Sequence, residues 1–228
     1  MKDNIAIIIP AYNPDKELEK IVQDLQEFEY TNIVVVNDGS KSKDIFNNIT
    51  NKVIVLQHEK NKGKGRALKT GIEYCQKNMK NIIGVITIDA DGQHIIKDIN
   101  NVYKTFEKKS ESLILGVRNF KNKNVPFKSK IGNKLATFIL QLKTKQKIKD
   151  TQTGLRAIPS KYLKVLYEKV EGERFEYEIN SLLYFIKNKV NIEEVTIDTI
   201  YFDHNKGTKY KPIKDSIKIY NIIKKFSK

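Results

Sequence analysis

The chain has 228 residues, of which 39% are hydrophobic and 30% charged. It is long enough to bury a substantial core as one domain, and too apolar to be wholly disordered. Cys75 is the single cysteine, which excludes an intramolecular disulfide framework. No apolar run approaches the ~18–20 residues that cross a bilayer, so we expect a soluble or peripheral protein rather than an integral one.

The formal net charge of +15 is concentrated in two segments. Residues 121–150 carry +8 and residues 204–228 carry +7, so the rest of the chain is balanced. Such a distribution favours a polyanionic partner, namely anionic lipid, nucleic acid or a phosphorylated substrate. Lysine-rich solvated helix faces are the plainer alternative.

Strands and helices are predicted to alternate through the first half. Short β-branched runs predict strands at 5–10, 32–37, 52–57 and 82–88. Helical spacing of apolar residues predicts helices at 15–28, 42–50 and 64–79. This alternation is typical of an α/β fold with a mostly parallel central sheet and flanking helices.

The second half is less regular. We expect an amphipathic helix over 128–142, a loop and then a strand over 150–159, a helix over 175–188 and a strand over 192–202. A basic amphipathic helix is predicted to start at Pro212, a favoured first helical residue. We therefore divide the chain into a domain at 1–211 and a C-terminal helix at 212–228.

Polar segments follow the predicted strands of the first half. They are Pro10-Ala11-Tyr12-Asn13-Pro14, Asn37-Asp38-Gly39-Ser40, Asn61-Lys62-Gly63-Lys64-Gly65-Arg66 and Asp89-Ala90-Asp91-Gly92-Gln93-His94. Ligands of open α/β sheets bind beyond the carboxyl ends of the strands, so all four segments should meet at one rim.

Asp89 and Asp91 are the predicted metal ligands. Two carboxylates this close repel each other unless a cation holds them ionised. Hard divalent ions prefer oxygen ligands, and Mg²⁺ commonly joins one or two carboxylates to a substrate phosphate. Gln93 could add an amide oxygen. Paired aspartates in a turn are common, so the shared rim is what strengthens this prediction.

Two further rim segments suit a nucleotide. Asp38 could accept a hydrogen bond from a ribose hydroxyl or a base N–H, or it could cap an Asx-turn or the helix at 42–50. Gly63-Lys64-Gly65 allows close backbone approach to a phosphate and supplies a cation. It matches neither a Walker loop nor a dinucleotide fingerprint.

The segments "IIIPAYN", "VVVNDGS", "NKGKGRALKTGI" and "DADGQH", in this order, resemble the nucleotide-diphospho-sugar glycosyltransferases of family 2, which have a GT-A fold. The resemblance covers about residues 4–118. It implies a donor site and a metal site, with Asp89 facing the ribose or the diphosphate. The donor-site residues we assign are Pro10, Ala11, Tyr12, Asn13, Asp38, Lys64, Gly65, Asp89 and Ala90; the metal ligands are Asp91 and Gln93 with Asp89, holding Mg²⁺ or Mn²⁺.

The second half is similar to the polyprenyl-phosphate glycosyltransferases, through "GVRNF", "SKIGNKL", "DTQTGLRAIP" and "RFEYEI". This resemblance implies that Arg118 and Lys130 hold the lipid phosphate, and we add Lys206 and Lys209 to that acceptor site. Lys130 stands where the family has a second arginine. Ile95-Ile96 replaces the usual prolines after the metal motif. No transmembrane tail like that of many relatives is present, so we expect membrane attachment to come from elsewhere.

The chemistry of the acceptor supports the same subfamily. A hydroxyl acceptor needs a general base, which family 2 polysaccharide synthases are expected to supply from a Glu-Asp pair, and no such dipeptide occurs here. Asp150 is the comparable carboxylate. A phosphate monoester, with a second pKa near ~6, is already mostly ionised and needs cations instead. We assign catalytic roles to Asp89, Asp91, Arg118 and Asp150, while an ordinary ion pair is the plain alternative for Arg118.

The sequence thus predicts an inverting, metal-dependent glycosyltransferase that moves a sugar from a UDP- or GDP-sugar to a polyprenyl phosphate. We expect a cytoplasmic protein, peripheral at the inner face of the membrane, that binds anionic lipid directly or is recruited by an integral membrane protein. The alternative is a family 2 enzyme with a hydroxyl acceptor on a cell-surface glycan or teichoic-type polymer.

Nucleic-acid binding is disfavoured because no binding motif appears and the rim carboxylates would repel phosphates. A catalytically inactive scaffold is disfavoured by the intact acidic motif, and a homo-oligomer stays open.

Overall fold

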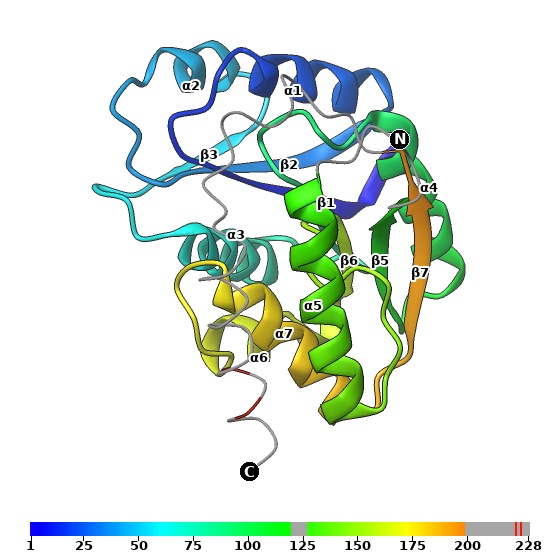
Figure 1. Cartoon of the computed structure of the whole chain (residues 1–228). Helices are drawn as coiled ribbons and strands as arrows, with labels where there is room; N and C mark the ends of the chain where they lie inside the picture. The colour runs from blue at the N-terminus through cyan, green and yellow to red at the C-terminus, as the bar shows by residue number, and fades with distance from the viewer. Residues whose placement is uncertain (120–126, 199–221, 223, 225–228) are drawn as a thin grey trace.

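The computed structural model describes residues 1–119, 127–198, 222 and 224. Its described strands form one mixed sheet, ordered β3-β2-β1-β4-β6-β5-β7, with helices on both faces (Figure 1). The strands are β1 (Lys2–Ala11), β2 (Tyr30–Asn37), β3 (Ile54–Gln57), β4 (Gly84–Thr87), β5 (Leu113–Arg118), β6 (Arg156–Pro159) and β7 (Ile192–Ile197). The helices are α1 (Glu17–Glu27), α2 (Asp44–Ile49), α3 (Lys64–Asn78), α4 (Ile96–Lys108), α5 (Phe127–Thr144), η1 (Ser160–Tyr162), α6 (Leu163–Glu168) and α7 (Glu176–Lys187).

Helices cover both faces of the sheet because the inner segments of its central strands are apolar on both faces, as in residues 5–9 of β1. Alternate residues of β1 point to opposite faces, so Ile5, Ile7 and Ile9 join one core cluster while Ala6 and Ile8 join the other. Helices α1, α2 and α4 contribute to the first cluster, and α3, α5, α6 and α7 to the second. This is the predicted α/β architecture with a mostly parallel sheet.

The parallel strands bring their carboxyl ends to one rim. Ala11 at the end of β1 pairs with Asn37 at the end of β2, which in turn pairs with Gln57 at the end of β3. Strand β4 runs parallel to β1 and ends at Thr87 beside Ile8. The four polar segments predicted to meet at one rim therefore do so.

Strand β6 brings the second half of the chain to the same rim. It runs antiparallel to both of its neighbours, β4 and β5, so it starts at the rim where they end. Arg118, the last residue of β5, and the loop that precedes Arg156 consequently lie at the edge that carries Asp89.

Several predicted boundaries shift and some elements were not predicted. The strand expected at 52–57 begins at Ile54, and the strand expected at 82–88 spans only Gly84–Thr87. Helices α4 and α6 were not predicted. The predicted strand at 192–202 is described to Ile197; residues 199–202 and the boundary at 211/212 lie outside the described residues. Among the helices that are described, none has the length and apolar character needed to span a bilayer.

Candidate active site

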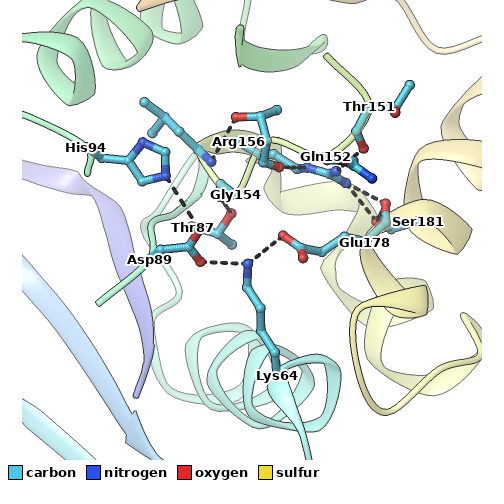
Figure 2. Close-up of polar contacts among 12 residues, drawn as sticks. Lys64, Thr87, Asp89, His94, Thr151, Gln152, Gly154, Arg156, Glu178 and Ser181 are labelled. Carbon is cyan, nitrogen blue, oxygen red and sulfur yellow. Dashed lines mark hydrogen bonds and ion pairs between the residues drawn. The ribbon is translucent and has the colours of Figure 1, made fainter. Parts of the chain in front are cut away.

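Lys64 joins two carboxylates at the centre of the rim (Figure 2). As the first residue of α3, it places its Nζ 2.6 Å from Asp89 Oδ1 and 3.0 Å from Glu178 Oε1. Burial alone would lower the pKa of Lys64, but the charges of Asp89 and Glu178 raise it above its ordinary value. Lys64 therefore stays protonated and supplies a fixed positive charge between two acidic groups.

Asp89 is held ionised by this arrangement. Burial opposes its charge, but Lys64 and then His94 lower its pKa well below the usual range. His94 Nε2 lies 3.8 Å from Asp89 Oδ2, beyond hydrogen-bond distance, and the imidazole is buried. Asp89 is thus a permanent anion just beyond the carboxyl end of β4.

Gly154 allows the loop before β6 to approach Asp89. A Cβ atom at this position would clash with the Asp89 carboxylate, and Thr87 Oγ1 donates a hydrogen bond to the Gly154 carbonyl over 2.8 Å. The glycine of "DTQTGLRAIP" therefore determines how closely the loop before β6 lies against Asp89. This role was not predicted, although a glycine between a polar loop and a strand is a recognised signal of close backbone approach.

Asp91 and Gln93 lie beyond Asp89 in the same turn. The Asp91 Oδ1 atom accepts the Gln93 backbone N–H over 3.1 Å, and the residue is exposed. Although the residue is exposed, neighbouring protein atoms partly shield its carboxyl group from water, and this shielding and the nearby charge of Asp89 raise the pKa of Asp91. A cation would relieve this repulsion, so two carboxylates and an amide oxygen fit a hard divalent ion such as Mg²⁺ or Mn²⁺. No cluster of three or more His, Cys, Asp and Glu side chains occurs among the described residues.

Asp38 anchors the loop that leads into α3. Its carboxylate accepts hydrogen bonds from the backbone N–H groups of Lys62 (2.9 Å) and Gly63 (2.8 Å), and it lies 2.7 Å from His58 Nδ1. The opposite ring nitrogen of His58 lies 2.9 Å from Thr70 Oγ1. Asp38 is 2% exposed, so it positions the segment before Lys64; its predicted contact with the nucleoside stays a prediction.

The remaining predicted donor residues line the ends of β1 and β4. Asn13 has a positive φ of 48°, its N–H donates to Ser40 Oγ, and its Oδ1 accepts the Lys41 N–H. Tyr12, the residue before it, is exposed, so its aromatic ring is accessible to a ligand. Pro10 and Ala90 are half-buried and Ala11 is buried.

Gly65 is buried within the first turn of α3. A Cβ atom there would lie 2.6 Å from the Arg174 carbonyl oxygen and 2.6 Å from Tyr177 Cβ. The glycine thus lets α3 approach the start of α7, which brings Glu178 to Lys64.

Arg118 and Asp150 form a second, separate pair. Arg118 Nε donates to Asp150 Oδ2 over 2.6 Å, and Nη2 donates to Oδ1 over 2.9 Å. The Asp150 side chain is fully buried, while that of Arg118 is 16% exposed. The geometry is the bidentate fork that guanidinium and carboxylate groups favour. Asp150 therefore fixes the direction of Arg118, and its predicted part in catalysis stays a prediction.

Arg156 is a buried cation between these two pairs. It is 3% exposed and donates to the carbonyl oxygens of Thr153, Glu178 and Thr151 and to Ser181 Oγ (Figure 2). Burial lowers its pKa, whereas the negative charges of Glu178, Asp150 and Asp89 favour its charged form. One buried guanidinium thus ties the loop before β6 to the first turn of α7.

The structure brings together most, but not all, of the predicted site. Lys64 and Asp89 are in contact, and Arg118 pairs with Asp150. Lys206, Lys209 and the side chain of Lys130 lie outside what the structure describes. Arg156 and Gly154 were not predicted as site residues, and Glu178 of the "RFEYEI" segment lies against Lys64.

Comparison with known proteins identifies the family of this chain. The sequence model of glycosyl transferase family 2 matches residues 6–167. The chain belongs to this family. It is therefore a glycosyltransferase, and the GT-A fold expected from the rim motifs is confirmed.

Its relatives include enzymes of dolichyl phosphate. A UDP-N-acetylglucosamine–dolichyl-phosphate N-acetylglucosaminyltransferase of Methanococcus voltae is 38% identical over 88% of this chain and 87% of its own. A dolichyl-phosphate beta-glucosyltransferase of Dictyostelium discoideum is 28% identical over 95% of this chain and 72% of its own. Among solved structures, glucosyl-3-phosphoglycerate synthase of Mycobacterium tuberculosis in complex with Mn²⁺ and UDP matches with a TM-score of 0.73 and 14% identity, over 98% of this chain and 80% of its own. This last likeness supports the fold.

Proposed function

We propose that this family 2 enzyme transfers a sugar from a nucleoside-diphosphate sugar to a polyprenyl phosphate, with inversion at the anomeric carbon and with Mg²⁺ or Mn²⁺. The observation that carries the proposal is the 38% identity, along nearly the whole of both chains, to a dolichyl-phosphate sugar transferase. We further propose that the reaction takes place at the cytoplasmic face of a membrane, where a polyprenyl phosphate resides.

The donor half of the proposal uses the rim of the parallel strands. Asp91, Gln93 and Asp89 would hold the metal ion, which when bound supplies positive charge to the diphosphate. Lys64 adds a second fixed cation next to Asp89. Asp38 and the turn at Asn13 shape the opposite wall, where the nucleoside would lie. The metal ion and Lys64 would together stabilise the negative charge that develops on the leaving nucleoside diphosphate.

The acceptor half depends on Arg118. A phosphate oxygen of the acceptor attacks the anomeric carbon and forms a new C–O bond. The bond from that carbon to the diphosphate oxygen breaks, and its electron pair leaves with the nucleoside diphosphate. No proton has to be removed, because a phosphate monoester is mostly ionised at neutral pH. The role of Arg118, oriented by Asp150, is to attract and orient the acceptor phosphate.

A hydroxyl acceptor on a glycan or teichoic-type polymer is the competing reading, and the geometry supports it less well. Such an acceptor needs a general base. Asp150 is fully buried with both oxygens bound to Arg118, and Glu178 is paired with Lys64. Both carboxylates are committed to neighbouring cations, which makes them poor proton acceptors.

The decisive experiment is a donor and acceptor screen. Purified protein is incubated with Mg²⁺ or Mn²⁺, polyprenyl phosphate and a panel of UDP- and GDP-sugars, and nucleotide release is measured. Mass spectrometry then identifies the product, for which an acid-labile lipid phosphosugar is expected. Turnover only when a hydroxyl acceptor replaces the lipid would overturn the proposal.

A further inference from the structure

Helix α5 carries an apolar stripe that faces away from the core. Leu135, Phe138 and Leu142 are 44%, 57% and 65% exposed. They stand at positions i, i+3 and i+7, which places them on one face of the helix. On the other face, Ala136 and Leu140 are fully buried in the core. Three large apolar side chains in one row at the surface indicate a contact surface rather than scattered exposure.

The surroundings of this stripe are basic. Lys134 and Lys143 are exposed within α5, and Lys145 and Lys147 are exposed directly after it. Residues 127–149 contain no aspartate or glutamate. Lys149 pairs with Glu194, but none of the described carboxylates forms an ion pair with those four lysines. An apolar row flanked by unneutralised cations is complementary to an anionic bilayer, which presents phosphates above hydrocarbon.

The stripe lies close in the chain to the proposed acceptor site. Asn133, buried in the middle of α5, donates its Nδ2 hydrogen to the Lys149 carbonyl over 2.9 Å. The next residue, Asp150, holds Arg118. One turn of α5 is therefore tied to the segment that orients the acceptor cation, and α5 stands at the front of the molecule in Figure 1.

We infer that Leu135, Phe138 and Leu142 of α5 are the membrane-contact surface of this enzyme, inserted among the headgroups of an anionic bilayer so that a lipid phosphate in the same bilayer can reach Arg118. The inference rests on the proposed function for its acceptor. It assigns the membrane contact to named side chains of α5, within the folded domain. A second copy of the chain is disfavoured as the occupant, since two identical basic faces repel each other.

Vesicle sedimentation tests the contact without depending on catalysis. Purified protein is mixed with vesicles of phosphatidylcholine, alone or with phosphatidylglycerol, at low and high salt. The double variant Phe138→Ser/Leu142→Ser should bind the anionic vesicles at least about tenfold more weakly than the wild type, because two apolar side chains no longer leave water. The double variant Lys134→Gln/Lys143→Gln should weaken binding by about fivefold per lysine at low salt and much less at high salt.

Phe28→Ser is the matched control. Phe28 is another exposed aromatic, 39% exposed, directly after α1 on the other face of the sheet. Its replacement should leave vesicle binding unchanged, and thermal unfolding should show that all variants fold. Equal binding by the wild type and the Phe138→Ser/Leu142→Ser variant would overturn the inference. Wild-type binding that requires an added integral membrane protein, or a dimer that this variant dissociates, would assign the stripe to a protein partner and would also overturn it.

An activity assay separates this inference from the proposed function. Transfer is measured to a long-chain polyprenyl phosphate in vesicles and to a short-chain, water-soluble polyprenyl phosphate. The stripe variant should lose activity on the vesicle acceptor and keep it on the soluble one. If the wild type uses neither acceptor while the stripe variant still loses vesicle binding, the proposed function fails and the contact surface stands. If the variant uses the vesicle acceptor as well as the wild type does, the contact surface fails and the proposed function stands.

Discussion

Asp91 differs from Asp89 in having no cation beside it within hydrogen-bond distance among the described residues. Lys64 pairs with Asp89, whereas the Asp91 carboxylate accepts a backbone N–H from Gln93. Asp91→Asn keeps that hydrogen bond and removes only the charge. We expect it to lower metal-dependent nucleotide release by at least about 100-fold, with no change in the melting temperature.

The control for this variant is Asp3→Ala. Asp3 is exposed near the start of β1, at the opposite end of the strand from the rim, so its loss should leave activity intact. Near-normal turnover by Asp91→Asn across a titration of Mg²⁺ and Mn²⁺ would remove Asp91 from the metal site.

A test of Arg118 has to change its ion-pair partner Asp150 as well. Removing the guanidinium alone would leave the fully buried Asp150 charge unpaired, at a cost of about 3–5 kcal/mol in stability. The double variant Arg118→Gln/Asp150→Asn replaces the ion pair by a neutral one. We expect the KM for lipid phosphate to rise at least about tenfold, with the KM for the donor changed less than about twofold. Equal rises for both substrates would move Arg118 to the donor site.

At the scale of elements, the approach of α3 to α7 determines the centre of the site. Replacing an exposed glycine within a helix by alanine usually stabilises the protein by about 1 kcal/mol. Gly65→Ala should have the opposite sign, because its Cβ would lie 2.6 Å from the Arg174 carbonyl oxygen. We expect a loss of about 1–3 kcal/mol in the free energy of unfolding by urea, together with a lower kcat, since Glu178 moves away from Lys64.

Gly71→Ala provides a comparison within the same helix. There the added Cβ would meet the Ile8 side chain at 2.6 Å, so it should also destabilise the packing of α3 on the sheet but leave kcat unchanged. A stabilised Gly65→Ala variant would show that α3 and α7 can separate without loss of packing.

The elements differ in how well the sequence predicts them. In α1 the buried residues Leu18, Ile21, Val22 and Leu25 repeat with helical spacing, and the helix was predicted. In α4 the residues Ile99, Val102, Tyr103 and Phe106 repeat in the same way, yet the helix was not predicted. Its N-cap is the apolar Ile95, which has no side-chain acceptor, whereas Asp15 Oδ1 accepts the Glu17 N–H at the start of α1.

The active site, too, could be predicted from the sequence only in part. The rim was predictable because parallel strands end together, which brings Lys64 and Asp89 to one edge. The contact of Glu178 with Lys64 joins residues far apart in the chain and depends on how α7 packs, which no local pattern encodes. Arg156 gave no signal either, because an arginine is usually exposed and its partners are mostly backbone carbonyls.

At the scale of the whole molecule, the stability of the fold should depend on pH through Asp98. This residue in the first turn of α4 accepts the Asp198 backbone N–H over 2.8 Å and so fastens the end of β7 to α4. Burial and the charge of Asp198 raise its pKa to about 6, while the hydrogen bond from the Asp198 N–H and the charges of Lys97 and His94 act in the opposite direction. The ionised form is therefore disfavoured in the folded state relative to the unfolded chain.

The direction in which stability changes with pH follows from the number of protons bound by the folded and the unfolded state. Between about pH 4 and pH 6 the folded protein holds a proton on Asp98 that the unfolded chain has lost, so the Asp98 contribution lowers stability as the pH rises. Asp98→Asn keeps an acceptor for the Asp198 N–H and carries no charge. We expect the variant to match the wild type near pH 4 and to exceed it by roughly 1–2 kcal/mol at pH 7 to 8, after allowance for screening by water. Urea unfolding at several pH values measures the difference, in which the titrations of all other groups cancel. A difference that stays constant from pH 4 to pH 8, or that is largest at the acid end, would show that Asp98 is ionised at no cost in the folded protein.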